Sequence, residues 1–117
     1  DVFTMYPIYV GDSDAQARAE VIEHWYRWRI FALEAQNFTP DNPMYQRVFG
    51  HLDYDAMVRD SRGIFGGPET CVRILKRVIE VVGTTHVGLT FHFGGLSQAK
   101  VLKSMERCAR LVLPELR

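Results

Sequence analysis

The stretch that decides the fold is FGGPETCVRILKRVIEVVGTTHVGLTFHFGGL, residues 65–96. It opens with a helix start: Gly67 can cap the helix, Pro68 suits the first helical position, and Glu69 complements the positive end of the helix dipole. Apolar residues then recur at helical spacing until Gly83, where a left-handed residue is expected to end the helix. The apolar stripe consists of Cys71, Val72, Leu75, Val78, Ile79 and Val82.

A strand is expected directly after this helix, over residues 86–93. Its residues alternate between two faces. One face carries Val87, Leu89, Phe91 and Phe93, and the other carries His86, Gly88, Thr90 and His92. Gly94-Gly95 ends the strand, and a helix capped by Ser97 follows until Pro114 stops it.

The same order of strand and helix occurs at the start of the chain. Residues 2–10 are rich in β-branched and aromatic residues and predict a strand, which Pro7 makes edge-like or bulged. Ser13 is expected to cap a helix that runs to about Ala35. The chain is therefore read as one domain, residues 1–117. Its strand–helix units lie near residues 2–35, 62–83 and 86–113, with an irregular insertion at 36–61.

Repeated strand–helix units predict an α/β fold with parallel strands and right-handed crossovers. A doubly wound sheet and a segment of a (β/α)8 TIM barrel both fit this order. No G-x-G-x-x-G pattern follows the first strand, so the doubly wound dinucleotide fold loses its main support. A complete barrel needs about 250 residues, so 117 residues with three units are expected to form part of one.

Composition narrows the classes of partner. The chain has 14 basic and 14 acidic residues, so no net field favours nucleic acid or an anionic membrane. Its apolar runs are far shorter than the roughly 20 residues that span a bilayer. The expected compartment is therefore the cytosol, with neither nucleic acid nor membrane as partner. Cys71 and Cys108 fall on apolar helix faces and are expected to be buried thiols rather than a disulfide.

Three segments resemble the luciferase-like monooxygenase family. Phe65-Gly66-Gly67-Pro68-Glu69, followed by a helix and Gly83, is similar to the family's "G-(T/S)-P-E, helix, G" element, with Gly67 where the family usually has a hydroxyl residue. Phe93-Gly94-Gly95-Leu96, with the helix that ends in residues 112–117, resembles the family's closing strand and helix. The first strand and residues 13–18 are similar to the "V-x-x-(S/T)-x-x-x-A" segment upstream. The chain thus resembles the C-terminal segment of such a barrel.

The resemblance implies a barrel that uses reduced FMN, or a deazaflavin in some relatives, to act with oxygen on a small organic substrate. The family's main flavin contacts lie mostly in earlier strands, so it carries no catalytic residue over to this chain. Activity is therefore expected only with the missing N-terminal part of the barrel, and the chain is expected to pair with that part or to self-associate. Two alternatives are a non-catalytic flavin-binding protein and a self-associating half-barrel without a ligand.

Candidate pocket residues follow from the rule that barrel sites lie at the C-terminal ends of strands. His92 and Thr90 are expected to face the lumen, with His92 at its mouth, where an imidazole could donate to a flavin or a substrate oxygen. Phe93 and two glycine pairs, Gly66-Gly67 and Gly94-Gly95, complete the set, because glycine permits close approach of a ligand to backbone amides. The alternatives are a histidine without a role and tight turns without a ligand, and the sequence favours the second of these for the glycines. No metal site is expected.

Overall fold

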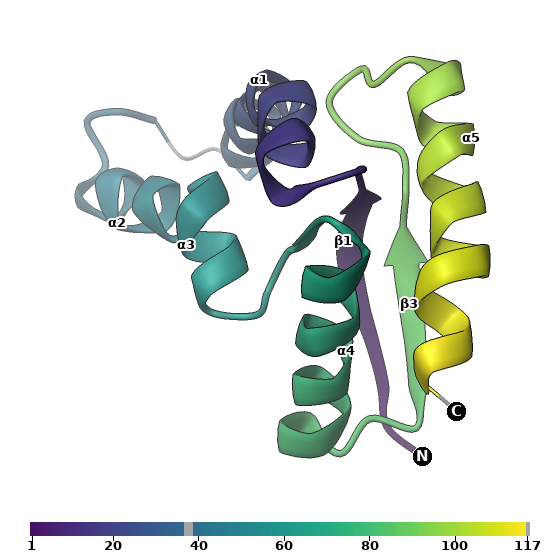
Figure 1. The fold of residues 1–117 in the computed structure, drawn as a ribbon. Helices are drawn as coiled ribbons and strands as arrows, with labels where there is room; N and C mark the ends of the chain where they lie inside the picture. Colours follow the sequence, from purple (N-terminus) through teal and green to yellow (C-terminus); the bar gives the residue numbers. More distant parts are fainter. Residues whose placement is uncertain (37–38, 117) are drawn as a thin grey trace.

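The computed structural model describes residues 1–36 and 39–116 (Figure 1). Three parallel strands form one sheet in the order β2-β1-β3. The predicted α/β class with parallel strands is therefore confirmed. The elements are β1 (Phe3–Val10), α1 (Asp14–Ala35), α2 (Pro43–His51), α3 (Tyr54–Arg59), β2 (Ile64–Gly66), α4 (Pro68–Val82), β3 (His86–Thr90) and α5 (Gln98–Arg107), followed by a π turn (Cys108–Val112) and a 3-10 turn (Leu113–Leu116).

β1 is the central strand, so the expectation that Pro7 makes it edge-like is wrong for the strand as a whole. β1 pairs with β3 over residues 3–7 and with β2 over residues 8–10. At each position β1 therefore has a neighbouring strand on one side only. Pro7 is tolerated because it lies where the pairing with β3 ends and the pairing with β2 has not begun.

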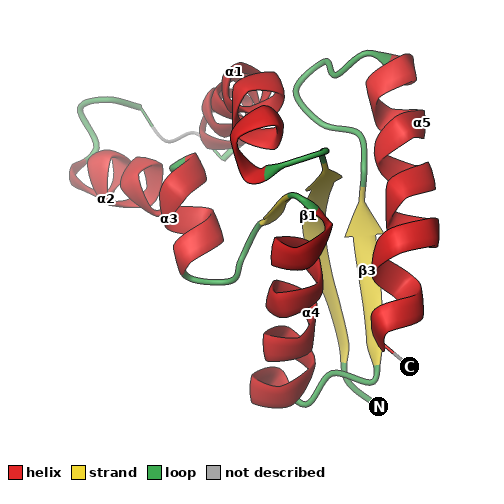
Figure 2. Cartoon of the chain, in the orientation of Figure 1, coloured by secondary structure: helices red, strands yellow, loops and turns green. Residues whose placement is uncertain are grey.

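α4 and the π turn that continues α5 pack against the same face of the sheet (Figure 2). Ile8 and Val10 of β1 point into this core together with Ile64 of β2. The two cysteines lie in the same core as free thiols, as expected. Burial raises the pKa of Cys71 to about 12, which keeps this thiol protonated and unreactive at neutral pH.

A second core lies on the opposite face, at the C-terminal end of β1. Tyr9, which alternates with Ile8 and Val10 along the strand, packs there against Ala17 and Trp25 of α1. Figure 1 shows α1, α2 and α3 grouped near the arrowhead end of β1. The segment after β1 therefore covers only the end of the sheet on this face.

The N-terminal half of β1 leaves the same face bare. Phe3 and Met5 are each 64% exposed, and His86 and Thr90 beside them on β3 are exposed as well. The two apolar side chains lie over Gly88, where an added Cβ would be 3.0 Å from each of them. Parallel sheets are normally covered on both faces. Among the described residues, this part of the sheet is covered on one face only.

Residues 39–61 contain two helices. α3 begins after Asp53, whose carboxylate caps it by accepting from the Ala56 N–H. α2 precedes it, with Asn42 as cap and Pro43 at its first position. Among the described residues none of the helices combines the length and apolar character needed to cross a bilayer.

Two predicted boundaries are wrong. β3 ends at Thr90 rather than at Phe93, because the chain turns at Gly94 with φ of +57° and Phe93 enters the second core. Pro114 does not stop the last helix, which continues as a π turn and then a 3-10 turn. The π turn is wider where the proline ring would otherwise meet the carbonyl oxygen of Arg110.

Side chains of α5 take the place of a strand beside the end of β1. Since β3 stops opposite Pro7, Val10 has no strand on that side. The Val10 N–H donates to Ser104 Oγ at 2.9 Å, and Arg107 Nη1 donates to the Val10 carbonyl oxygen at 3.3 Å. Arg107 also pairs with Asp12 at 2.7 Å. The helix thereby satisfies backbone groups that would otherwise be buried without partners.

We expect Ser104→Ala to lower the free energy of unfolding by about 1–3 kcal/mol, because it leaves the buried Val10 N–H without an acceptor. Urea denaturation followed by circular dichroism measures this loss. Lys103→Ala, at an exposed position of the same helix, is the matched control and should cost less than about 0.5 kcal/mol. Equal losses for the two variants would show that the bond to Val10 contributes nothing.

Candidate functional site

A pocket of about 320 Å³ lies beside the middle of β1 and the C-terminal end of β3, on the face opposite α4 and α5. Sites in parallel α/β proteins lie at the C-terminal ends of the strands. Four segments far apart in the sequence build its wall. The lining residues are Met5, Tyr6 and Pro7 of β1, Trp25 and Trp28 of α1, Leu52, Met57 and Arg62 of the segment between α1 and β2, and Thr90 and Phe93 at the end of β3.

Aromatic rings form the fixed part of this wall. Trp25 and Trp28 stack with their ring centroids 4.7 Å apart, and Phe93 meets Trp25 edge to face at 5.4 Å. Trp25 is buried and donates its indole N–H to the carbonyl oxygen of Leu52. Because the rings hold one another and one is anchored by a hydrogen bond, the wall is organised before any ligand binds.

Arg62 is the one charged residue among those that line the pocket. Its guanidinium donates to the His51 carbonyl oxygen at 2.6 Å and lies 3.4 Å from a carboxylate oxygen of Asp60. Sequence reasoning missed Arg62, because its partners are brought together only by the turn between α3 and β2. The pocket is therefore mainly apolar with one positive charge.

Of the pocket residues predicted at the end of β3, two line the pocket and one does not. Thr90 and Phe93 line the pocket. His92 is exposed and is not part of the lining. The alternation that was expected to turn His92 and Thr90 to one side does not extend past Thr90, where the strand ends.

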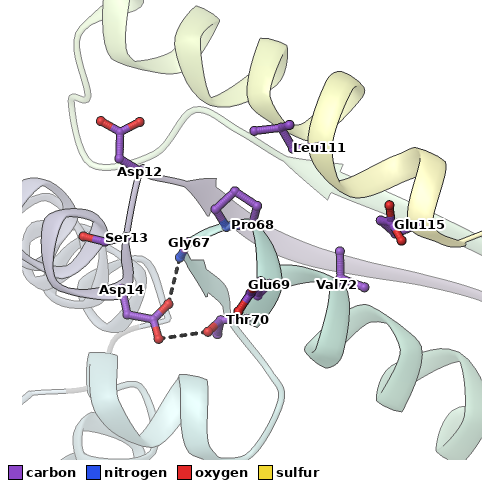
Figure 3. Close-up of a pocket in the computed structure, with 10 residues that line it drawn as sticks. All are labelled: Asp12, Ser13, Asp14, Gly67, Pro68, Glu69, Thr70, Val72, Leu111 and Glu115. Atoms are coloured by element: carbon purple, nitrogen blue, oxygen red, sulfur yellow. Dashed lines mark hydrogen bonds between the residues drawn. The ribbon is translucent and has the colours of Figure 1, made fainter.

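Gly66-Gly67 begins α4, and its amide is already engaged within the chain. The Gly67 N–H donates to Asp14 Oδ1 at 2.8 Å, and the Thr70 hydroxyl donates to Asp14 Oδ2 at 2.9 Å (Figure 3). The carboxylate of α1 thus occupies the position where a helix N-terminus favours an anion. The surrounding hollow of about 730 Å³ is also lined by Asp12, Glu69 and Glu115, which disfavour a second anion.

Gly94-Gly95 holds α1 against the end of β3. His24 Nδ1 is hydrogen bonded to the Gly94 carbonyl oxygen at 2.8 Å. A Cβ on Gly94 would lie 1.8 Å from the His24 carbonyl oxygen, so only glycine fits. Gly94 therefore serves the docking of α1, which carries the tryptophan wall. Across the described ranges 1–36 and 39–116, no group of three His, Cys, Asp or Glu residues could hold a metal ion.

Comparison with known proteins places this geometry in a family context. The chain is 29% identical over 121 residues to the alkanal monooxygenase alpha chain of Aliivibrio fischeri, an alignment that covers 91% of this chain and 34% of that protein. The predicted resemblance to the luciferase-like monooxygenases is confirmed. No model of a known protein family matches the chain.

A solved structure shows that the fold also agrees. The crystal structure of the monooxygenase RslO1 from Streptomyces bottropensis superimposes with a TM-score of 0.67 at 16% identity, and covers 100% of this chain and 31% of that one. At this identity the likeness concerns the fold. The chain spans about a third of the length of both proteins.

We expect Gly94→Ala to lower the free energy of unfolding by more than about 3 kcal/mol, since the new Cβ must displace the α1 backbone and opens the second core. Gly95→Ala is the control: Gly95 has φ of +76° but nothing within 4 Å of its Cβ position, so only the conformational cost of about 1–2 kcal/mol applies. Thermal melting of both variants tests this. Equal melting temperatures would contradict it.

Proposed function

We propose that this chain forms the C-terminal part of the barrel of a flavin-dependent luciferase-like monooxygenase, which uses reduced FMN and oxygen to oxidise a small organic substrate. The observation that supports this most directly is the aromatic pocket beside the middle of β1 and the end of β3, on a sheet face that α1 covers only at the end of β1. The similarity to an alkanal monooxygenase supports the same reading.

The bare half of β1 supports a barrel segment, whereas the strand order does not, because β3 pairs with β1 and successive strands of a barrel are neighbours. α4 and the π turn after α5 lie on one face of the sheet. In a barrel the helices surround the strands and the opposite face turns inward, which accounts for the exposed Phe3 and Met5. A doubly wound sheet has a helix layer on each face, whereas α1 covers only the end of β1.

The described residues suit the ring system of FMN better than its phosphate. The stacked Trp25 and Trp28 with Phe93 offer a flat apolar wall for a ring system. At the two glycine pairs the geometry is less suited to a phosphate, because the Gly67 amide is bonded to Asp14 and Gly94 is packed against His24. This division agrees with main flavin contacts outside this chain.

The role of this chain in the reaction is then to shape and dry the pocket. Bound reduced flavin supplies the electrons for oxygen chemistry. The aromatic wall and Met57 exclude water from the reacting groups, and Arg62 offers a cation that can orient a polar group of the substrate. None of these residues is assigned to proton transfer.

We expect the full-length gene product to consume oxygen with reduced FMN and to lose at least about ten-fold in kcat/KM when Trp28 is replaced by Ala, because that change removes half of the stacked wall. Phe31→Ala, at an exposed position of the same helix, is the control and should leave the rate unchanged. Oxygen-electrode traces measure both variants. A protein that neither binds FMN nor consumes oxygen would refute the proposal.

The bare face also favours association. Phe3 and Met5 together with two short outer strands leave apolar surface and unpaired edges. We expect the 117-residue chain to self-associate at micromolar concentration, and Met5→Lys to shift it toward the monomer. Light scattering measures the mass, and a monodisperse monomer of the unmodified chain would contradict this expectation. A self-associating half-barrel without flavin is the alternative that such assembly without FMN binding would favour.

A further inference from the structure

We infer that the hollow between α1, α3 and α4 is a site for a phosphate group, whose oxygens are bound by the Tyr54 hydroxyl and the Arg73 guanidinium. The hollow has a volume of about 270 Å³ and shares no lining residue with the aromatic pocket. Pockets for drug-sized ligands usually have about 300–1,000 Å³, so inorganic phosphate or a small phosphate ester suits this hollow better. The site is separate from the flavin and substrate pocket of the proposed function.

Tyr54 brings a buried hydroxyl that is free to donate. The residue is only 4% exposed and lines the hollow. Its ring stacks on that of Phe65 with the centroids 5.0 Å apart, which fixes the direction of the hydroxyl. In the described part of the chain this hydroxyl has no hydrogen-bond partner, and burial raises the pKa of Tyr54, so it stays protonated at neutral pH. Buried polar groups normally have partners, so the free hydroxyl indicates that an acceptor from outside the chain binds here.

Arg73 adds a positive charge to this donor. The other two arginines of the lining are engaged. Arg18 donates to both carboxylate oxygens of Asp55, at 3.0 Å and 2.9 Å. Arg59 donates to both oxygens of Asp60, at 3.1 Å and 3.2 Å. Arg73 lines the hollow from α4, is exposed, and has neither an ion pair nor a side-chain hydrogen bond within residues 1–36 and 39–116. Its planar fork of N–H groups matches two oxygens of an anion.

The two carboxylates of the lining are already satisfied by groups of the chain. Both oxygens of Asp55 accept from Arg18. Those of Asp14 accept from the Gly67 N–H and the Thr70 hydroxyl at the start of α4 (Figure 3). The positive end of the helix dipole offsets the Asp14 charge there. The groups left free in the hollow are therefore donors.

Donors from two elements suit phosphate better than a carboxylate. The guanidinium fork of Arg73 by itself satisfies both oxygens of a carboxylate. Tyr54 of α3 offers a further donor on another side of the hollow, and a phosphate group has a third oxygen to accept from it. Free phosphate and a phosphate ester share this chemistry.

Calorimetric titration of the full-length gene product with inorganic phosphate, at constant ionic strength and without FMN, tests the site. We expect Tyr54→Phe to weaken phosphate binding about ten-fold, because it removes one donor to a charged acceptor and keeps the ring on Phe65. Arg73→Gln should weaken it by at least about ten-fold. Neither change should lower the melting temperature of the phosphate-free protein, since neither polar group is bonded within the described chain.

Arg77→Gln is the matched control, because Arg77 lies one turn further along α4, is exposed and does not line the hollow. It should leave the phosphate affinity unchanged. Phenyl phosphate and acetate are titrated in parallel. Tighter binding of phenyl phosphate than of phosphate identifies a phosphorylated compound as the source of the group, and the reverse order identifies the free ion.

Phosphate that binds no more tightly than acetate, or equal effects of Arg73→Gln and Arg77→Gln, would overturn the inference. If Tyr54→Phe weakens the binding of FMN but not of riboflavin, the hollow holds the flavin phosphate and a separate site is wrong. Phosphate binding that depends on Tyr54, in a protein that binds no flavin, supports the site and contradicts only the proposed function.

Discussion

The hydrogen bonds to the Val10 peptide group connect the parts of this structure. On one side the Val10 N–H donates to Ser104 and the Val10 carbonyl oxygen accepts from Arg107, both of α5. On the other side the Gly11 N–H donates to the Gly66 carbonyl oxygen at 2.9 Å. The end of β1 is thus tied to α5, to β2 and to the start of α1 within two residues. Since α1 begins immediately after this point, the position of the tryptophan wall depends on these bonds.

Helix α2 is attached differently from the two cores. α2 has no buried residue. Arg29 of α1 holds it by donating to the Phe49 carbonyl oxygen and by stacking over the Phe49 ring. The guanidinium carbon lies 3.7 Å from the ring centroid. Burial lowers the pKa of Arg29, and its Nε has no partner in the described part of the chain. A helix held in this way opens locally at less cost than a packed core.

Local signals in the sequence were sufficient for the helix ends, since Ser13, Ser97 and the left-handed Gly83 act as predicted. They also gave the α/β class and the family resemblance. Contacts across the chain were not predictable from them: Val10 and Ser104 are 94 residues apart. The strand order, the place of Pro7 and the pocket around Arg62 all depend on such contacts. His92 shows the limit most clearly. The alternation of residues along β3 predicts that its side chain faces the pocket, but β3 ends at Thr90 and His92 is exposed.

The pocket and the bare face of the sheet are continuous, because Met5 belongs to both. A partner that covered Phe3 and Met5, as the proposed function implies, would therefore also close one side of the pocket. Such a partner and a ligand would both contact Met5, so each would remove water from apolar surface that the other also buries. By linkage, a ligand that binds better to the covered form must strengthen the covering by the same factor. Under the proposed function, assembly and ligand binding are therefore expected to be coupled through Met5 of β1.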